Sequence, residues 1–303
     1  MIKRAPFSEL EQRYSLTKFD NLLHANTLNT LKDKLVTTEN GIHLLQRGQA
    51  SSGVYQHQRG QASRNDFGLS FKCQNSMSET DGYYETIIFK NKVIPTRPNS
   101  WHDLFNGLIW LSFPNTKTLL NQWHVEDIQA HGLTPRTQRR NQITLFDECG
   151  IILAVSDSQV CEYLANHQWQ KVFIEDRHKW VNHCSMLDHD VKVASNKDGQ
   201  IDNPQIKAFV FGHANYEMLL NPFIGLTGKW LAIRVNDSFF SENYAQQLSI
   251  LDLSLYHYLL SKNSLSNTGK LPPIPLLGIP SWYPANRYKE FYLNEEYFRP
   301  ARN

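Results

Sequence analysis

Three short stretches of this sequence carry side chains that can act as acids, bases or metal ligands. In chain order they contribute His102, Asp103 and Asn106; Asp147 and Glu148; and His213 and Glu217. Imidazole and carboxylate groups together can move protons or hold a divalent cation. The three stretches are remote from one another in sequence. This chemistry therefore depends on a fold that brings them together around one pocket.

The first stretch, NSWHDLFNGLIWLSF, predicts a helix over 101–113 that the Ser100 side chain can cap. The helix is apolar nearly all round, which is typical of a buried helix. His102 and Asn106 are four residues apart and share a face, so we expect them to be buried or at the wall of a cleft, with polar partners. The alternative is a core histidine that bonds Asn106 or the main chain. Asp103 can simply favour the first turn through the helix dipole.

The third stretch begins a short predicted helix, HANYEMLL, directly after the predicted strand IKAFVF. A histidine at a helix start lies near unpaired N–H groups, and the positive end of the dipole lowers the pKa of His213. A neutral imidazole with the Glu217 carboxylate one turn later suits a metal ion or a proton relay. Gly212 is free to adopt a left-handed turn. The alternative is a capping histidine beside a surface glutamate.

The second stretch lies in NQITLFDECGIILAVS, whose β-branched and aromatic runs predict a hairpin with its turn ending at Gly150. Strict alternation puts Asp147 on the same face as Ile143 and Leu145, at the rim of the sheet. From there its carboxylate can point towards the core side. The alternative is that Asp147 and Glu148 only hydrogen-bond the turn.

Basic residues near these stretches predict an anion-binding site. Arg97 directly precedes the predicted helix, and Arg136, Arg139 and Arg140 form a short basic run. Guanidinium groups bind phosphate or carboxylate through paired N–H donors, although such arginines also pair with surface acids. The segment 176–190 is dense in histidine and aspartate but lacks a standard zinc spacing, so a polar loop is the first interpretation.

Composition excludes several classes of protein. The chain has 303 residues, of which 41% are hydrophobic and 20% charged, enough for a large core. Its net charge of +2 gives no electrostatic basis for bulk DNA or membrane binding. No apolar run approaches the roughly 20 residues of a membrane span, and the N-terminus lacks a secretory pattern. With its four cysteines in no CxxC motif, the sequence predicts a cytoplasmic protein. The oligomeric state is left open.

The chain divides into three parts by its sequence composition and hydrophobic pattern. Residues 1–36 predict an N-terminal helical segment, in which Ser8 and Glu11 form a capping-box pattern. Residues 37–82 are polar, contain QRGQAS twice and predict a loosely structured connection. Residues 83–303 predict the main domain, including a Pro-rich C-terminal tail.

The order of elements in the main domain favours an α+β fold. YYETIIFKNKVIPT reads as two short strands, a longer helix is expected over 244–260, and the tail from Leu271 is expected to run extended over the surface. Strands in hairpin-like pairs, with helices that do not alternate strictly with them, predict a mostly antiparallel sheet with packed helices in a single large domain.

Five segments occur together in one order: IPTRPNSWHDLFNGLIWLSFPNTKTLLN, TLFDECG, FGHANYE, PLLGIPSWYPAN and FYLNEEYFRP. In this combination the chain resembles the bacterial domain-of-unknown-function family 3025, over about residues 80–303. The resemblance implies a bacterial, cytoplasmic protein and brings no established activity or catalytic residue. Its segments include Arg97 and the seven residues of the opening paragraph, without assigning them roles.

Three hypotheses about function follow, and the first is that the protein is an enzyme. The acid–base set would be His102, Asp147, Glu148, His213 and Glu217, and a divalent metal would be held by His213, Glu217 and Asp147. Arg97, Asp103 and Asn106 would then bind a small anionic substrate. Hydrolysis, for example of a phosphoester, is the natural reaction class for such a set.

The other two hypotheses are not enzymatic. A nucleic-acid-binding module would contact phosphates through Arg136, Arg139 and Arg140, with aromatic residues stacking on bases. An interaction protein would use the polar set as a structural network and meet a partner through its tail or through residues 37–82. Metal content separates the first hypothesis from these, and a salt-sensitive gel shift identifies the second.

Overall fold

The computed structural model describes residues 4–19, 23–46, 68–78, 82–181, 204–262, 265 and 271–301. Its α-helices are α1 (Phe7–Tyr14), α2 (Ala25–Gln46), α3 (Tyr84–Asn91), α4 (Trp101–Ser112), α5 (Pro114–His131), α6 (Gln138–Cys149), α7 (Gln159–Ala165), α8 (His213–Leu220) and α9 (Tyr244–Lys262). Its strands are β1 (Ser70–Cys73), β2 (Val93–Thr96), β3 (Gly150–Val155), β4 (Ile206–Val210), β5 (Thr227–Arg234) and β6 (Pro273–Pro275). Shorter helical turns are Leu16–Lys18, Gln74–Ser76, Lys171–Glu175, Arg177–Lys179, Asp237–Ser241, Leu276–Gly278, Pro284–Arg287 and Lys289–Leu293.

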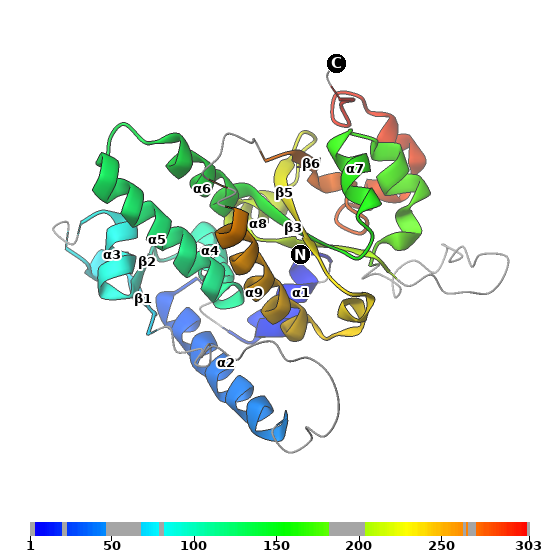
Figure 1. Ribbon diagram of the computed structural model, residues 1–303. Coiled ribbons are helices and arrows are strands. Elements are labelled where there is room, and N and C mark those ends of the chain that lie inside the picture. Colours follow the sequence, from blue (N-terminus) through cyan, green and yellow to red (C-terminus); the bar gives the residue numbers. More distant parts are fainter. Residues whose placement is uncertain are drawn as a thin grey trace.

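A four-stranded sheet in the order β4-β3-β5-β6 forms the centre of the molecule, with helices around it (Figure 1). Every residue of β3 and β4 is buried, as expected for strands that are covered on both faces. β3 runs antiparallel to β4 but parallel to β5, and β6 runs antiparallel to β5. The fold is α+β, as predicted, but the prediction of a mostly antiparallel sheet is wrong because this sheet is mixed. The separate pair β1-β2 is parallel.

α4 fulfils the prediction of a buried helix. The Ser100 hydroxyl accepts a hydrogen bond from the Asp103 main-chain N–H and caps the helix. α4 packs against α5, α8, α2 and α9, which explains why it is apolar nearly all round. α5 follows at once with Pro114 in its first turn, where the missing N–H costs nothing. These contacts fix the position of the polar residues of α4.

The predicted hairpin around Gly150 is wrong, because residues 138–149 form helix α6 and only the following residues form a strand. The Thr137 hydroxyl caps α6 by accepting the main-chain N–H of Arg140. Arg140, Ile143 and Phe146 are buried at spacings of three, which is one face of a helix. The β-branched residues of this stretch suggested a strand, but packing overrides such propensities. Asp147 and Glu148 consequently belong to the last turn of a helix.

The prediction of two strands in YYETIIFKNKVIPT is half wrong. Its first part is helix α3, in which Ile87 and Ile88 are buried, and the chain leaves the helix through Lys92 in a left-handed conformation. The second part is β2, as predicted. Tyr84 and Glu85 therefore lie in the first turn of a helix rather than on a strand.

The C-terminal tail does not run over the surface as predicted. β6 adds an edge strand to β5, and Leu276, Leu277 and Ile279 are fully buried beyond it. The segment then makes three short helical turns beside α7 (Figure 1). The Trp169 indole N–H donates to the main-chain carbonyl of Arg299, 2.7 Å away. Prolines are compatible with an edge strand, and the apolar residues between them drive the burial.

The N-terminal helices pack on the same hydrophobic core as the sheet. The expected capping box is wrong, because α1 begins after Pro6 and the Glu11 carboxylate accepts hydrogen bonds from Thr17 instead. The buried Lys207 ammonium of β4 lies 3.1 Å from the Glu9 carboxylate of α1. The division at residues 36 and 82 remains a prediction. Beyond Gln46, both QRGQAS copies lie outside the described residues, as do residues 182–190.

Within the described part of the chain, no helix is both long and apolar enough to cross a membrane.

Candidate metal and acid–base site

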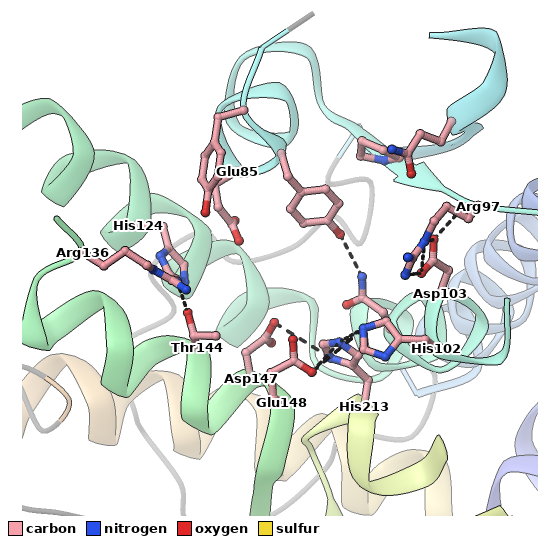
Figure 2. Close-up of a pocket in the computed structure, with 15 residues that line it drawn as sticks. Glu85, Arg97, His102, Asp103, His124, Arg136, Thr144, Asp147, Glu148 and His213 are labelled. Carbon is pink, nitrogen blue, oxygen red and sulfur yellow. Dashed lines mark hydrogen bonds and ion pairs between the residues drawn. The ribbon is translucent and has the colours of Figure 1, made fainter. Parts of the chain in front are cut away.

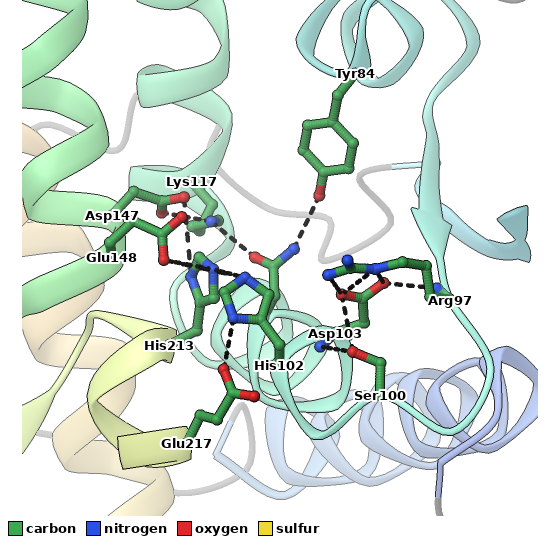
Figure 3. Close-up of polar contacts among 11 residues, drawn as sticks. Tyr84, Arg97, Ser100, His102, Asp103, Lys117, Asp147, Glu148, His213 and Glu217 are labelled. Carbon is green, nitrogen blue, oxygen red and sulfur yellow. Dashed lines mark hydrogen bonds and ion pairs between the residues drawn. The ribbon is translucent and has the colours of Figure 1, made fainter.

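Three helices place His102, Glu148 and His213 against one another (Figure 3). His102 comes from the first turn of α4, Glu148 from the last turn of α6 and His213 from the first residue of α8. The two Nε2 atoms of the imidazoles are 3.0 Å apart. Oε2 of Glu148 lies 3.3 Å from Nε2 of His213 and 4.0 Å from Nε2 of His102. These three side chains are the only described group of this kind that could hold a metal ion.

The close approach of α6 and α8 depends on Gly212. A Cβ atom at this position would lie 2.4 Å from the main-chain oxygen of Glu148 and 2.4 Å from the main-chain nitrogen of Gly150. The φ of Gly212 is −71°, so the residue does not adopt the left-handed turn that a glycine is free to take. The glycine is needed because a side chain would not fit between the two main chains. This contact sets His213 beside Glu148.

Glu217 lies behind His102 and fixes its orientation. Its Oε2 atom is 2.9 Å from Nδ1 of His102. A carboxylate can only accept a hydrogen bond, so in the neutral ring Nδ1 carries the proton and Nε2 presents a lone pair. A carboxylate on the outer nitrogen of an imidazole is the usual support of a metal-binding histidine.

His213 is a neutral imidazole at neutral pH. Burial lowers its pKa to about 3, and the Lys117 charge acts in the same direction, while Asp147 opposes both. Its Nδ1 atom lies 4.0 Å from Oδ2 of Asp147. The neutral form is the one that binds metals or accepts a proton.

Asp147 is held by Lys117, a residue that the sequence analysis missed. The buried Lys117 ammonium donates to Oδ1 of Asp147 at 2.5 Å and to Oδ1 of Asn106 at 3.1 Å. Burial alone would raise the pKa of Asp147, but the Lys117 charge and hydrogen bond hold it below its usual value. The signal in the sequence was a single lysine in NTKTLLN, among residues that the structure buries.

Asn106 connects this pair to α3. Its amide nitrogen donates to the Tyr84 hydroxyl at 2.8 Å, while its oxygen accepts from Lys117. The interpretation of His102 as a core histidine bonded to Asn106 is therefore wrong. Both side chains of this face have partners, but the partners come from other helices.

Arg97 and Asp103 form a closed pair at the edge of the site. The guanidinium donates to Oδ1 of Asp103 at 2.6 Å, and the main-chain N–H of Arg97 donates to Oδ2 at 2.6 Å. Burial would raise the pKa of Asp103, but these contacts hold it below its usual value. Much of the Arg97 charge is thus balanced within the protein.

A cavity of about 400 Å³ opens beside the three side chains, and its lining includes nine charged or histidine side chains and two tyrosines (Figure 2). Its far side carries residues that the sequence analysis missed, namely Tyr84, Glu85 and His124. Burial raises the pKa of Glu85 to about 7 and lowers that of His124 to about 4. Glu85 could be assigned to the cavity only if residues 84–91 were predicted as the helix α3 rather than as a strand.

The three clustered arginines have separate environments. Arg136 lines the cavity and donates to the Thr144 hydroxyl. Arg139 lies near Glu126 and over the Trp123 ring. Arg140 is buried and donates to the main-chain carbonyls of Gly132 and Leu133. Arg140 is therefore not available to a nucleic-acid phosphate, and the nucleic-acid hypothesis remains a prediction with weakened support.

Comparison with curated proteins and with solved structures gives no match. The profile of a family described as "Protein of unknown function (DUF3025)" matches residues 69–190 and 192–302. The match includes the helices that carry all seven residues of the three stretches, as well as Lys117 and Glu85. The chain belongs to this family, DUF3025.

Proposed function

We propose that His102, Glu148 and His213 hold a divalent metal ion and that the protein hydrolyses a small anionic ester in the adjoining cavity. One observation carries the proposal: the two Nε2 atoms and the Glu148 oxygen lie within 3.0–4.0 Å of one another. With Nδ1 of His102 directed at Glu217, Nε2 of His102 presents its lone pair towards Nε2 of His213 and the Glu148 oxygen. A cation bound between the three atoms would be attracted by the Glu148 charge and by the imidazole lone pairs.

The distances also suit a metal. A triangle with sides of 3.0, 3.3 and 4.0 Å has a central point about 2.0 Å from each corner, and zinc lies about 2.0–2.2 Å from nitrogen and oxygen ligands. Two histidines and one glutamate form one of the ligand sets of catalytic zinc sites, which keep a position open for water or substrate. Zinc is therefore the favoured ion.

This ligand set revises the one predicted from the sequence. His213 keeps its role, whereas Glu217 orients His102 and Asp147 pairs with Lys117. The Glu217 carboxylate then acts on His102 from behind, where such groups raise ligand basicity and fix ring orientation, whereas Asp147 lies 4.0 Å from Nδ1 of His213, beyond hydrogen-bond distance. The prediction from the sequence was that these residues share one site, with Glu217 and Asp147 as metal ligands rather than as supporting carboxylates.

The cavity supports hydrolysis as the reaction. A bound divalent ion would activate water and withdraw charge from an ester oxygen. Arg136 supplies a guanidinium whose described partner is the neutral Thr144 hydroxyl, so its charge is open to an anionic substrate. The lining also holds Gln74, Tyr84 and Asn106, whose polar groups suit a polar rather than an apolar ligand. A phosphoester is both anionic and polar and therefore fits both features.

The test begins with metal binding by metal-free protein, measured by titration calorimetry with zinc. We expect one zinc per chain, no stoichiometric binding by the His102→Ala and His213→Ala variants, and 10- to 100-fold weaker binding by Glu217→Gln, as is usual for an outer carboxylate. Glu295→Gln, which changes an exposed glutamate of the C-terminal segment that does not line the cavity, is the matched control. Unchanged zinc binding in both histidine variants would refute the site.

The activity follows from the same preparation. Zinc-loaded protein should hydrolyse 4-nitrophenyl phosphate or bis(4-nitrophenyl) phosphate, and Glu148→Gln should abolish that turnover. The third hypothesis, an interaction protein with a structural network, instead predicts loss of stability without any zinc-dependent turnover in the unaltered protein.

A further inference from the structure

We propose that Glu85 is the general acid of this cavity and gives its carboxyl proton to the leaving oxygen of a phosphate monoester. The inference rests on the proposed function and deepens it by assigning the second half of the reaction. It concerns the wall of the cavity that α3 and α5 form, opposite the metal site.

The position of Glu85 is fixed from two sides. It lies in the first turn of α3, half-buried, and its side chain enters the cavity across from Asp147 and Glu148 (Figure 2). The Asn121 amide of α5 donates to Oε2 of Glu85 at 2.7 Å and to its main-chain oxygen at 2.9 Å. Because Oε2 already accepts an N–H, the acidic proton belongs on Oε1. The carboxyl is thus held as an oriented donor.

The charges around Glu85 keep that proton in place at neutral pH. Burial and the Asp147 carboxylate of α6 raise its pKa to about 7. Asn121 and Lys117 of α5, and Arg136 from the segment before α6, act in the opposite direction and prevent a larger rise. A group with a pKa near the working pH is the most effective proton donor.

Glu148 is assigned to the metal and Asp147 is ionised beside Lys117, and three further titratable groups of the described lining fit this role less well than Glu85. Tyr84 is partly buried, and desolvation raises its pKa well above the usual value, so its proton is held too tightly. His124 has a pKa lowered to about 4 and carries no acidic proton at neutral pH. Asp103 is ionised and bound by Arg97. Glu85 therefore remains as the donor.

The step balances without another reactant. The oxygen of a water molecule forms a bond to phosphorus while the bond from phosphorus to the leaving oxygen breaks. The leaving oxygen takes the Glu85 proton and departs as an alcohol. The proton of the water is released to solvent, from which the Glu85 carboxylate regains its own. Neither oxidation nor reduction occurs.

The test compares two substrates in the zinc-loaded full chain: phenyl phosphate, with a poor leaving group, and 4-nitrophenyl phosphate, with a good one. Glu85→Gln keeps the shape of the side chain and one donor but has no acidic proton. We expect kcat/KM for phenyl phosphate to fall about 10²- to 10⁴-fold, the usual worth of a general acid, and that for 4-nitrophenyl phosphate to fall much less. The fall of the rate above about pH 7 should also disappear.

Controls separate this role from a structural one. At pH 4.5, where the Glu85 carboxyl of the folded protein keeps its proton, Glu85→Gln should unfold at nearly the same temperature as the unaltered protein. It should also bind zinc as the unaltered protein does, and Glu295→Gln should leave both rates unchanged. Equal losses for the two substrates would overturn the role of Glu85 while leaving the proposed hydrolase intact. No zinc-dependent hydrolysis of either substrate by the unaltered protein would overturn both proposals.

Discussion

The Nε2 atoms of His102 and His213 lie 3.0 Å apart although 111 residues separate them in the chain. The rings meet edge to face with their centroids 4.5 Å apart. Each histidine is placed at the start of its helix, and the two helices, α4 and α8, pack against each other. The pair is therefore a product of the core packing, and the chemistry at the site is tied to the stability of that packing.

Replacing Lys117 by Met should destabilise the protein by about 3–5 kcal/mol, because the Asp147 carboxylate would lose its buried partner. Urea unfolding followed by circular dichroism measures this loss. The double variant Lys117→Met, Asp147→Leu should regain much of the stability, since neither charge is then left alone. A loss below about 1 kcal/mol for the single variant, as for an exposed ion pair, would contradict the burial of this pair.

Gly212→Ala should disturb the site without altering any polar side chain. The added Cβ would meet the main chain of residues 148–150, so α6 and α8 must move apart. We expect a destabilisation of at least about 1–3 kcal/mol and a weaker zinc affinity. Gly225→Ala is a useful comparison, because a Cβ there meets nothing within 4 Å although its positive φ disfavours alanine. Zinc binding that Gly212→Ala leaves unaltered would show that the contact does not position His213.

The stability of the protein should depend on pH through Glu85. Its pKa is raised from 4.5 to about 7, so the folded state binds the proton more tightly than the unfolded state. The resulting stabilisation is complete below pH 4.5 and is lost as the pH rises through 7. Glu85→Gln removes this dependence. Relative to the unaltered protein, its free energy of unfolding should improve by about 2 kcal/mol between pH 4.5 and pH 8, allowing for partial exposure.

Denaturant unfolding at several pH values gives this difference directly. A constant difference between the two proteins over that range would mean that Glu85 ionises at its ordinary pKa. Its assignment as a general acid would then lose its electrostatic basis.

Arg136→Gln should raise KM for 4-nitrophenyl phosphate about tenfold or more, because a charged hydrogen bond to an anion contributes about 1.5–3 kcal/mol. Arg139→Gln is the matched control, since Arg139 lies in the first turn of α6, three residues after Arg136, but pairs with Glu126 and does not line the cavity. Steady-state kinetics give KM for both variants and show whether Arg136 binds the anionic substrate. Equal KM values for the two would exclude Arg136 as the anion-binding group.

Helices with strong boundary signals could be predicted from the sequence. α4 has its Ser100 cap and α5 its Pro114, and both were correctly placed. The errors lie in α3 and α6, where residues such as Ile87 and Ile143 favour strands in isolation but are buried on helical faces. Local propensity cannot anticipate this, because the packing partners come from distant parts of the chain.

The candidate site shows the same limit. The sequence indicated His102, Glu148 and His213 as site residues, because of their side-chain types and their positions near the ends of predicted helices and strands. The partner of Asp147 could not be found, because a lysine is usually exposed and Lys117 becomes buried only through tertiary packing. The roles of Glu217 and Glu85 likewise depend on which helix faces which, a relation that spacing along the chain does not contain.

X-ray absorption at the zinc edge of the zinc-loaded protein tests the central claim most directly. The proposed site predicts one zinc per chain with two imidazole nitrogens and a carboxylate oxygen about 2.0–2.2 Å from the metal, and loss of one imidazole from the spectrum of His102→Ala. A spectrum without imidazole scattering, or one that His102→Ala leaves unchanged, would contradict it.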